Sequence, residues 1–369
     1  MSDDGNDGTS PLRLLVVDDS AYNRQTITSM LESRPGVKVV GRAVNGKEAL
    51  KLVFDLEPDA ITLDLEMPEM DGFSFLRLLM SKRPTPVIVI SGYAQRDNVF
   101  RALELGAMDF IAKPGRHISP DIREIADDLG QKVQMVRRLH AVRLKERADS
   151  LARQRNPEPP SSREESEPLP DERPRLVVGI GASTGGPPAI QQLLGGLKLD
   201  GRSAVLIAQH MPARFTRAFA SRLDRVVDMR VVEAIDGMPL AAGVVYVAPG
   251  QANLVVAVTD DGRPVARVVA PADDGGPSIT PSADQLFSSG AAAFKDRFCA
   301  VVLTGMGSDG TRGAREVKQH GGTVICEDPR SAVMPGMPHS VVEAGAADQV
   351  AALEHLPAAI VAFEDRFRD

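Results

Sequence analysis

The sequence predicts two α/β domains joined by a linker, and three observations lead to this fold class. The chain has 369 residues, which is more than one ordinary domain requires. Short apolar runs alternate with longer amphipathic segments along both halves, as they do in parallel α/β proteins. Between the halves, Asn156–Pro174 is rich in Pro, Glu, Ser and Arg and has no apolar period, which is typical of a linker.

The first domain is predicted from a regular alternation of strands and helices that begins at Leu12. The predicted strands are Leu12–Val17, Val37–Ala43, Ala60–Leu63, Val87–Ile90 and Asp109–Ala112, and the predicted helices are Ala21–Ser33, Asn45–Leu56, Phe73–Met80 and Asn98–Leu105. Asn45 and Glu48 have the spacing of a capping box, and Ser119-Pro120 suits the start of a fifth helix. Five strands alternating with five helices predict a doubly wound, five-stranded parallel sheet of the flavodoxin-like type.

The domain boundaries follow from changes in composition along the chain. We expect residues 1–10 to be disordered and residues 11–135 to form the first domain. Residues 136–174 are expected to be a linker that starts helical and then becomes disordered. Residues 175–367 would form the second domain, with three α/β/α layers around a mostly parallel sheet. Within it, the Gly-, Pro- and Asp-rich residues 262–282 are expected to be a surface loop.

Composition and charge exclude several classes of function. The net charge is −7, so no nucleic-acid or anionic-membrane surface is expected. No apolar run approaches membrane-spanning length, and the acidic residues after Met1 do not resemble a secretory signal. The two cysteines, Cys299 and Cys326, lie in apolar runs and are interpreted as buried, reduced thiols of a cytoplasmic protein. The six histidines have no zinc-ligand spacing, so no metal is expected in the second domain.

Polar side chains follow the strands of the first domain where these strands end. They are Asp18 and Asp19 after the first strand, Asp64 after the third, Ser91 after the fourth and Lys113 after the fifth. Because the carboxyl ends of parallel strands meet at one edge of a sheet, we expect these side chains to lie close together. Three neighbouring carboxylates repel each other unless a cation lies among them, and hard oxygen ligands favour Mg²⁺. With Asp64 as nucleophile, the arrangement predicts a phosphoryl-acceptor site.

Three apolar runs of the second domain each lead to a reactive side chain. Gly181-Ala-Ser183-Thr-Gly185 has the G-x-S-x-G pattern of a nucleophile elbow, and Pro187-Pro188 suits the start of a helix after it. Ala204–Gln209 is followed by His210, and the run that begins at Val301 leads through glycines to Asp309. Serine, histidine and aspartate just past strand ends are the components of a nucleophilic triad.

Two alternatives compete with the triad. In an α/β-hydrolase the acid precedes the histidine, so the order Ser183, His210, Asp309 argues against that fold. The string Gly305-Met-Gly307-Ser-Asp309-Gly310 also matches the dinucleotide fingerprint, and Glu327 ends the next apolar run, so NAD binding is a rival hypothesis. Against it, Asp309 would place a carboxylate beside a pyrophosphate at a helix N-terminus.

Residues 12–130 resemble a response-regulator receiver domain. The resemblance rests on Asp18-Asp19, the string from Asp64 to Gly72, Ser91 and Lys113-Pro114. It implies that Asp64 is the phosphorylated residue. It implies that Mg²⁺ is held directly by Asp19, Asp64 and the Glu66 carbonyl, and mostly through water by Asp18. The remaining implied roles are those of Ser91 as switch hydroxyl, Phe110 as coupled aromatic residue, Lys113 as charge anchor and a cis peptide before Pro114.

Residues 176–345 resemble the catalytic domain of chemotaxis-type protein-glutamate methylesterases, the CheB family. The matching strings are Gly-Ala-Ser183-Thr-Gly-Gly, Gln-His210-Met-Pro, Pro281-Ser-Ala-Asp-Gln-Leu-Phe287, Leu303-Thr-Gly-Met-Gly-Ser-Asp309-Gly and Gly336-Met-Pro338. The resemblance implies that Ser183 is the nucleophile, His210 the general base and acid, and Asp309 the orienting carboxylate. It implies oxyanion stabilisation near Met306 by backbone N–H, with Thr184 in support. The chain departs from the family pattern at Ile279-Thr280, where members often carry His-Arg, and at Ala283, where valine is usual.

Together the two resemblances imply a phosphorylation-activated esterase. Its substrates would be glutamate γ-methyl esters on the cytoplasmic domains of chemoreceptors, with glutamine deamidation through the same acyl-enzyme. A sensor histidine kinase would be the phosphodonor, and we expect a cytoplasmic monomer with no cofactor in the esterase domain. The alternative class is a non-catalytic phospho-switch with a docking domain, against which the intact Ser183, His210 and Asp309 set argues.

Overall fold

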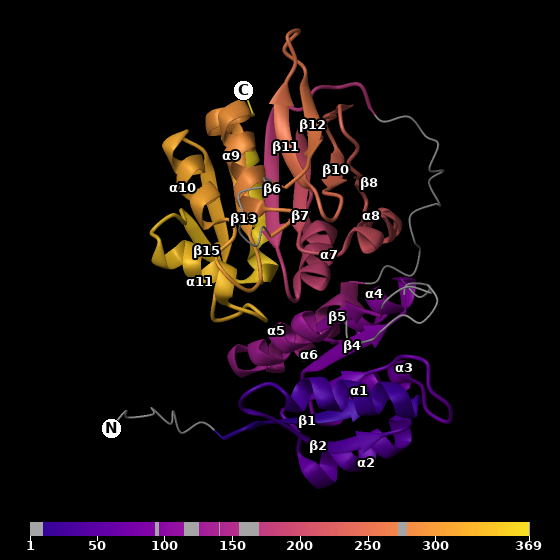
Figure 1. Ribbon diagram of the computed structural model, residues 1–369. Helices are drawn as coiled ribbons and strands as arrows, with labels where there is room; N and C mark the ends of the chain where they lie inside the picture. The colour runs from indigo at the N-terminus through magenta and orange to yellow at the C-terminus, as the bar shows by residue number, and fades with distance from the viewer. Residues whose placement is uncertain are drawn as a thin grey trace. The chain divides into compact units, whose positions relative to one another are not determined.

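The computed structural model describes residues 10–92, 96–113, 125–139, 141–154, 170–271 and 279–368. The chain divides into two compact units, Met1–Lys145 and Glu146–Asp369, and the division falls inside helix α6 (Ala141–Gln154; Figure 1). Several sequence predictions concern residues outside the described ones. They are the disorder of residues 1–9, the cis peptide before Pro114, the helix start at Ser119-Pro120 and the linker residues 155–169.

The first unit contains the predicted five-stranded parallel sheet. Its strands are β1 (Leu12–Val17), β2 (Val37–Ala43), β3 (Ala60–Leu63), β4 (Val87–Ser91) and β5 (Asp109–Ala112), and its helices are α1 (Ala21–Glu32), α2 (Gly46–Leu56), α3 (Gly72–Lys82), α4 (Arg96–Glu104), α5 (Ala126–Met135) and the 3₁₀ turn η3 (Val136–Arg138). The strand order β2-β1-β3-β4-β5, parallel throughout, confirms the doubly wound fold. Strands β3 and β4 are buried along their whole length, which is why they are apolar runs without alternation.

The capping prediction at Asn45 is confirmed with one difference. The Asn45 side chain accepts the Glu48 N–H at 2.9 Å and so caps the start of α2. The Glu48 carboxylate reaches back to the N–H of Val44 at 2.9 Å, one residue before the cap. The pair therefore fixes the chain on both sides of the helix start, as a capping box does.

The second unit is built on a seven-stranded parallel sheet. Its strands are β6 (Leu176–Ala182), β7 (Ser203–Gln209), β8 (Arg230–Glu233), β10 (Val244–Val247), β13 (Phe298–Val302), β14 (Thr323–Glu327) and β15 (Gln349–Ala351), in the order β15-β14-β13-β6-β7-β10-β8. A second, antiparallel sheet consists of β11 (Asn253–Val258), β12 (Pro264–Val269) and β9 (Met238–Pro239). The helical segments are α7 (Gly186–Gly196), α8 (Ala213–Val226), α9 (Ala283–Phe294), η4 (Lys295–Arg297), α10 (Thr311–Gln319), α11 (Gly336–Glu343), η5 (Leu353–His355) and α12 (Leu356–Asp365).

Helices cover both faces of this sheet, as the three-layer prediction requires. Gly179 and Gly181 of β6 face Phe287 of α9, and a Cβ at Gly181 would lie 2.6 Å from the Cβ of Ala283. Ala182, the next residue, points to the other face, where α7 begins at Gly186. Gly181 therefore allows helix α9 to pack closely against β6, in addition to permitting the sharp turn at Ser183.

The prediction of a surface loop at residues 262–282 is wrong for part of that range. Pro264–Val269 forms β12 and pairs antiparallel with β11 (Figure 1). Val265 and Ala266 are buried in this strand, so the segment contributes to the core despite its flanking glycines and prolines. Pro264 occupies the first position of the strand, where a missing N–H is tolerated. Residues 272–278 lie outside the described residues.

Two further sequence expectations can be compared with the structure. Cys299 and Cys326 are both buried free thiols, and burial raises the pKa of Cys326 to about 12. This confirms that they are not a disulfide pair. Among the described residues, no helix combines the length and the apolar composition needed to cross a membrane.

Candidate active site

Ser183 and His210 occupy equivalent positions on neighbouring strands of the second unit. Strands β6 and β7 pair in parallel, and Ala182 lies opposite Gln209 at the last pair of the register. Ser183 and His210 are the next residues on each chain, and the His210 N–H donates to the Ala182 carbonyl at 3.0 Å. Adjacent strands lie about 4.8 Å apart, so the two side chains emerge side by side at the carboxyl edge of the sheet.

Asp309 reaches the same edge from the loop after β13, the other neighbour of β6. Its Oδ2 lies 2.8 Å from Nε2 of His210. The Nε2 nitrogen therefore faces the carboxylate, which leaves Nδ1 as the ring nitrogen available to a serine hydroxyl. The structure thus brings the three predicted residues to one rim, from three adjacent strands.

The Asp309 carboxylate is held by the start of helix α9. It accepts the N–H groups of Ala283 at 2.7 Å and Asp284 at 2.9 Å, and the Ser282 hydroxyl at 3.0 Å. Burial alone would raise the pKa of the Asp309 carboxyl, but the hydrogen bond and charge of His210 and the two N–H donors outweigh it. The pKa consequently lies below its ordinary value, and the carboxylate stays ionised beside the imidazole.

The departure at Ala283 does not disturb this arrangement. Ala283 holds Asp309 through its backbone N–H, and its Cβ packs against the glycine side of β6. Sequence analysis missed Ser282, which both caps α9 and donates to Asp309, and Asn253, whose Oδ1 accepts the Ser282 N–H at 2.8 Å. The only signal for Ser282 was its place before a helix, and nothing local in the sequence indicates Asn253.

Of the two predicted oxyanion residues, Thr184 lies within the serine turn, and Met306 follows Gly305, which contacts Ser183. Gly185 adopts the left-handed conformation with φ of 75°, which closes the turn before α7. The Ser183 N–H donates to the Thr304 carbonyl at 3.0 Å, which ties the turn to the strand end that leads to Met306. A Cβ at Gly305 would lie 2.8 Å from the Ser183 Cβ, so Met306 follows directly after a residue that touches the serine. The Met306 side chain is 40% exposed beside this turn.

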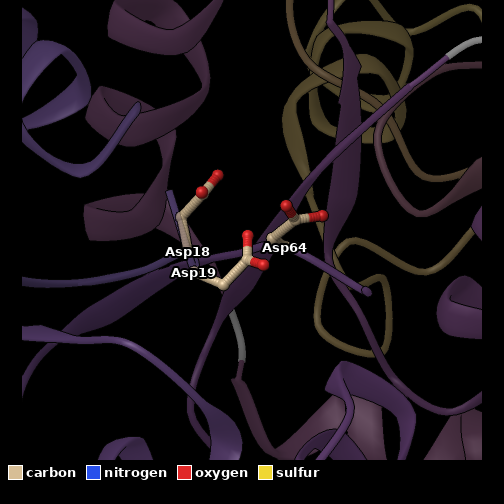
Figure 2. A group of neighbouring side chains, drawn as sticks. All are labelled: Asp18, Asp19 and Asp64. Atoms are coloured by element: carbon tan, nitrogen blue, oxygen red, sulfur yellow. The ribbon is translucent and has the colours of Figure 1, made fainter. Parts of the chain in front are cut away.

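In the first unit, Asp18, Asp19 and Asp64 meet at the ends of β1 and β3. One carboxylate oxygen from each lies within 4.8 Å of the others, and Figure 2 shows the three groups gathered there. Asp18 and Asp64 are buried and Asp19 is exposed. Carboxylate oxygens with one open side fit a hard divalent cation such as Mg²⁺, so the donor set agrees with the predicted metal.

Lys113 lies against the same carboxylates. Its Nζ is 2.6 Å from Oδ2 of Asp64 and 3.2 Å from Oδ2 of Asp18. Burial raises the pKa of the Asp64 carboxyl, Lys113 opposes this, and the Asp18 charge adds to it, so the pKa lies above its ordinary value. For Lys113 burial alone would lower the pKa, but the Asp64 and Asp18 charges raise it, so the ammonium stays charged.

The other predicted site residues of the first unit lie on β4 and β5 or shortly after β3. Ser91 is buried at the end of β4, the strand beside β3. Phe110 of β5 is buried and packs edge-on against Phe100, with ring centroids 6.5 Å apart. Glu66 is exposed, and its N–H helps to hold the Asp64 carboxylate.

The contacts of Glu327 and Asp309 argue against the alternative hypothesis of a dinucleotide site. Glu327, which would bind a ribose hydroxyl, is fully buried and lies 2.6 Å from the guanidinium of Arg147. Asp309 occupies the N–H groups at the start of α9, and it also accepts the Gly310 N–H at 3.0 Å. The two carboxylates at these positions, Asp309 and Glu327, are thus committed to contacts within the protein.

The two folds and their sites define the class of protein. It is a response regulator joined to a hydrolase in which serine, histidine and aspartate meet at one edge of the sheet. Residues 14–120 match the response regulator receiver domain, and residues 178–360 match CheB methylesterase. A Geobacter sulfurreducens protein named protein-glutamate methylesterase/protein-glutamine glutaminase 3 is 44% identical, over 95% of this chain and 96% of its own length. A Myxococcus xanthus protein of the same name, numbered 1, is 44% identical over 97% of this chain and 98% of its own.

The chain therefore belongs to the CheB family of protein-glutamate methylesterases/protein-glutamine glutaminases, and it is an enzyme of the hydrolase class. Among solved structures, the Thermotoga maritima CheB methylesterase catalytic domain is 37% identical, covers 51% of this chain and 97% of its own, and has a TM-score of 0.48. The family assignment rests on the full-length relatives.

Proposed function

We propose that this enzyme hydrolyses glutamate γ-methyl esters on the cytoplasmic signalling domains of chemoreceptors and deamidates glutamine at equivalent positions. The two reactions are those named for the relatives, and the alignments with these relatives cover nearly the whole chain. The protein would work in the cytoplasm as a monomer, with a sensor histidine kinase as phosphodonor. Its catalytic domain would be residues 175–367 and its receiver domain residues 11–135, joined by residues 136–174.

Ser183, His210 and Asp309 carry the chemistry in this proposal. The Ser183 Oγ attacks the γ-carbonyl carbon of the ester while its proton passes to Nδ1 of His210. His210 returns the proton to the methoxy oxygen, methanol leaves, and an acyl-enzyme remains on Ser183. Water, deprotonated by His210, then attacks the acyl carbon; the bond from that carbon to Ser183 Oγ breaks, His210 returns the proton to Oγ, and the glutamate side chain is released. With a glutamine side chain the first leaving group is ammonia.

The remaining residues orient these groups and hold the developing negative charge. Asp309 stabilises the imidazolium form of His210 across their 2.8 Å contact. The oxyanion would lie near the backbone N–H groups of Thr184 and Met306, at the start of α7. The contact between His210 and Asp309, beside a serine in matching register, is the observation that carries the proposal.

The receiver site would control this activity through phosphorylation of Asp64. Asp19, Asp64 and the Glu66 carbonyl would hold Mg²⁺, with Asp18 behind them, and the cation would neutralise charge on the transferred phosphoryl group. Lys113 would bind a phosphoryl oxygen from the position where it now contacts Asp64. Ser91 would donate its hydroxyl to the phosphoryl group, and Phe110 would respond to that movement.

The proposal is tested by methanol release from methylated chemoreceptor membranes. Ser183→Ala should abolish release without unfolding the protein, and Ser183→Ala combined with His210→Ala should lose little more than either change alone. A serine-directed fluorophosphonate probe should label Ser183 in the wild type only. Near-normal methanol release from Ser183→Ala would overturn the assignment of Ser183 as nucleophile, whereas a wild type that releases no methanol and resists the probe would favour the non-catalytic phospho-switch.

A further inference from the structure

A buried ion pair lies beneath the turn that carries Ser183. Nη2 of Arg147, on helix α6, is 2.6 Å from Oε1 of Glu327, at the end of β14. Glu327 is fully buried and Arg147 is 8% exposed. Both residues belong to the second unit, although they are far apart in the sequence. A fully buried carboxylate needs such a partner, because an unpaired charge in the protein interior is strongly unfavourable.

The second oxygen of Glu327 leads directly to the nucleophile. Its Oε2 accepts the Thr304 N–H at 2.7 Å. Thr304 in turn accepts the Ser183 N–H on its carbonyl at 3.0 Å. The Thr304 hydroxyl donates to the Thr184 carbonyl at 2.9 Å, so Thr304 is bonded to the residues on both sides of the Ser183–Thr184 peptide. Two hydrogen bonds therefore separate Glu327 from the backbone of the nucleophile.

Arg147 also reaches the turn by a second route. Its Nη1 donates to the Gly185 carbonyl at 3.5 Å, at the left-handed residue that closes the turn. One planar guanidinium thus contacts both the carboxylate under Thr304 and the turn itself. A lysine ammonium carries the charge but lacks this planar, two-point geometry.

We propose that Arg147 is a positioning residue for the esterase reaction, which holds the Ser183 turn in its reactive geometry through Glu327 and Thr304. This inference rests on the proposed function of Ser183. It places a residue of helix α6 in the catalytic unit, before the start predicted from the sequence at residue 175. Without Arg147, the fully buried Glu327 carboxylate would lose the charge that compensates it, and its bond to the Thr304 N–H would weaken.

The test uses the full chain and four variants: Arg147→Gln, Arg147→Lys, Glu327→Gln, and Arg147→Gln with Glu327→Gln. Methanol release gives kcat and KM, and the rate of labelling by a fluorophosphonate probe reports the Ser183 hydroxyl without any receptor. Arg147→Gln should lower kcat and the labelling rate roughly 10- to 100-fold with KM within about twofold, as expected when a reactive geometry is loosened. The double variant leaves no buried charge and should recover most of the loss.

Arg330→Gln is the matched control, because Arg330 pairs with Asp328 next to Glu327 but is 89% exposed. It should keep wild-type kcat, KM and labelling rate. Wild-type rates in a folded Arg147→Gln protein would overturn the inference, as would a loss confined to KM. A double variant as slow as the single one would overturn the route through Glu327. Should Arg147→Gln fail to fold, Arg147→Lys takes its place: a lowered kcat and labelling rate would support the inference, and wild-type rates would overturn it. If Ser183→Ala stays active, the proposed function itself fails, which is a separate result.

Discussion

Asp309 is the residue whose environment most sharply limits what it can do. Its oxygens accept bonds from His210, Ala283 and Asp284, so an amide group there would direct an N–H toward donors. We expect Asp309→Asn to keep the fold but misorient His210, and to lower the rate of methanol release roughly 10³- to 10⁴-fold, as in serine proteases. Calorimetry should find no NAD binding to either form. Micromolar NAD affinity of the wild type would favour the dinucleotide alternative instead.

The low pKa of Asp309 also predicts a pH dependence of stability. Because the folded-state pKa lies below the ordinary value of 3.8, Asp309 stabilises the fold at neutral pH. That contribution is lost as the pH falls from 3.8 through the folded-state pKa. Urea unfolding between about pH 6 and pH 2 should therefore show a wild-type advantage over Asp309→Asn that shrinks toward acid. Asp260→Asn, in an exposed turn, is the control and should follow the wild type. A gap that stays constant with pH would contradict the assignment.

Sequence alone indicated the candidate residues for the chemistry but not the residues that contact and orient them. Ser183 and His210 stand out because each is a polar residue directly after an apolar run. Ser282 and Arg147 have no such signal, because their roles depend on segments that meet only in the folded sheet. Contacts of this kind are set by strand order, which local patterns do not specify.

At the scale of elements, the start of helix α7 depends on one small residue. A Cβ at Gly186 would lie 2.0 Å from Oε1 of Gln209, whose Nε2 donates to the carbonyls of Ser183 and His210 at 2.9 and 3.0 Å. Gly186→Ala should push Gln209 away, lose both bonds, and cost about 2 kcal/mol of stability at about 1 kcal/mol per bond. Because both carbonyls belong to proposed catalytic residues, Ser183 and His210, kcat should fall as well.

Thermal unfolding and methanol release check this prediction. Gly92→Ala is a suitable control, since a Cβ there would meet nothing within 4 Å. Normal stability and rate in Gly186→Ala would mean that the Gln209 bonds do not hold the two strand ends.

The sequence predicted elements well where a strand is buried on both faces and poorly where it is not. Strands such as Ala60–Leu63 are continuous apolar runs and were found at their observed bounds. Pro264–Val269 was missed because it begins with proline, contains an arginine and is only half buried. This segment is a strand because it pairs with Asn253–Val258 in an antiparallel hairpin, and local sequence does not show that pairing.

At the scale of the whole molecule, two α/β units share one chain, and helix α6 runs across their division. The two fold classes follow from composition and periodicity, because each sheet needs its own apolar strands. The start of the catalytic unit does not follow from composition. Arg147 lies in a basic amphipathic helix that resembles a linker in sequence, and its contact with Glu327 in the folded chain links it to the second unit. The boundary at residue 175 therefore remains a prediction, and Arg147 is the residue that tests it.

Covalent linkage also predicts how the receiver unit controls the esterase. A receiver tethered to its target acts at high effective concentration, and the simplest use of this arrangement is restraint of the esterase until Asp64 is phosphorylated. Phosphorylation would place a dianionic group between Lys113 and the Ser91 hydroxyl, where Lys113 now pairs with Asp64 at 2.6 Å. That change would release the restraint.

We expect a small-molecule phosphodonor with Mg²⁺ to raise methanol release by the full chain roughly 5- to 150-fold, the usual range of coupling between two sites. Asp64→Asn should keep the basal rate and show no response, because it lacks the acceptor. A chelator should remove the response of the wild type without changing its basal rate, since we expect Mg²⁺ to bind at the carboxylates of Asp18, Asp19 and Asp64 and to take no part in the esterase reaction. A response that survives in Asp64→Asn would place the acceptor elsewhere. A wild type that never responds would mean that the receiver acts by recruiting the enzyme to its substrate.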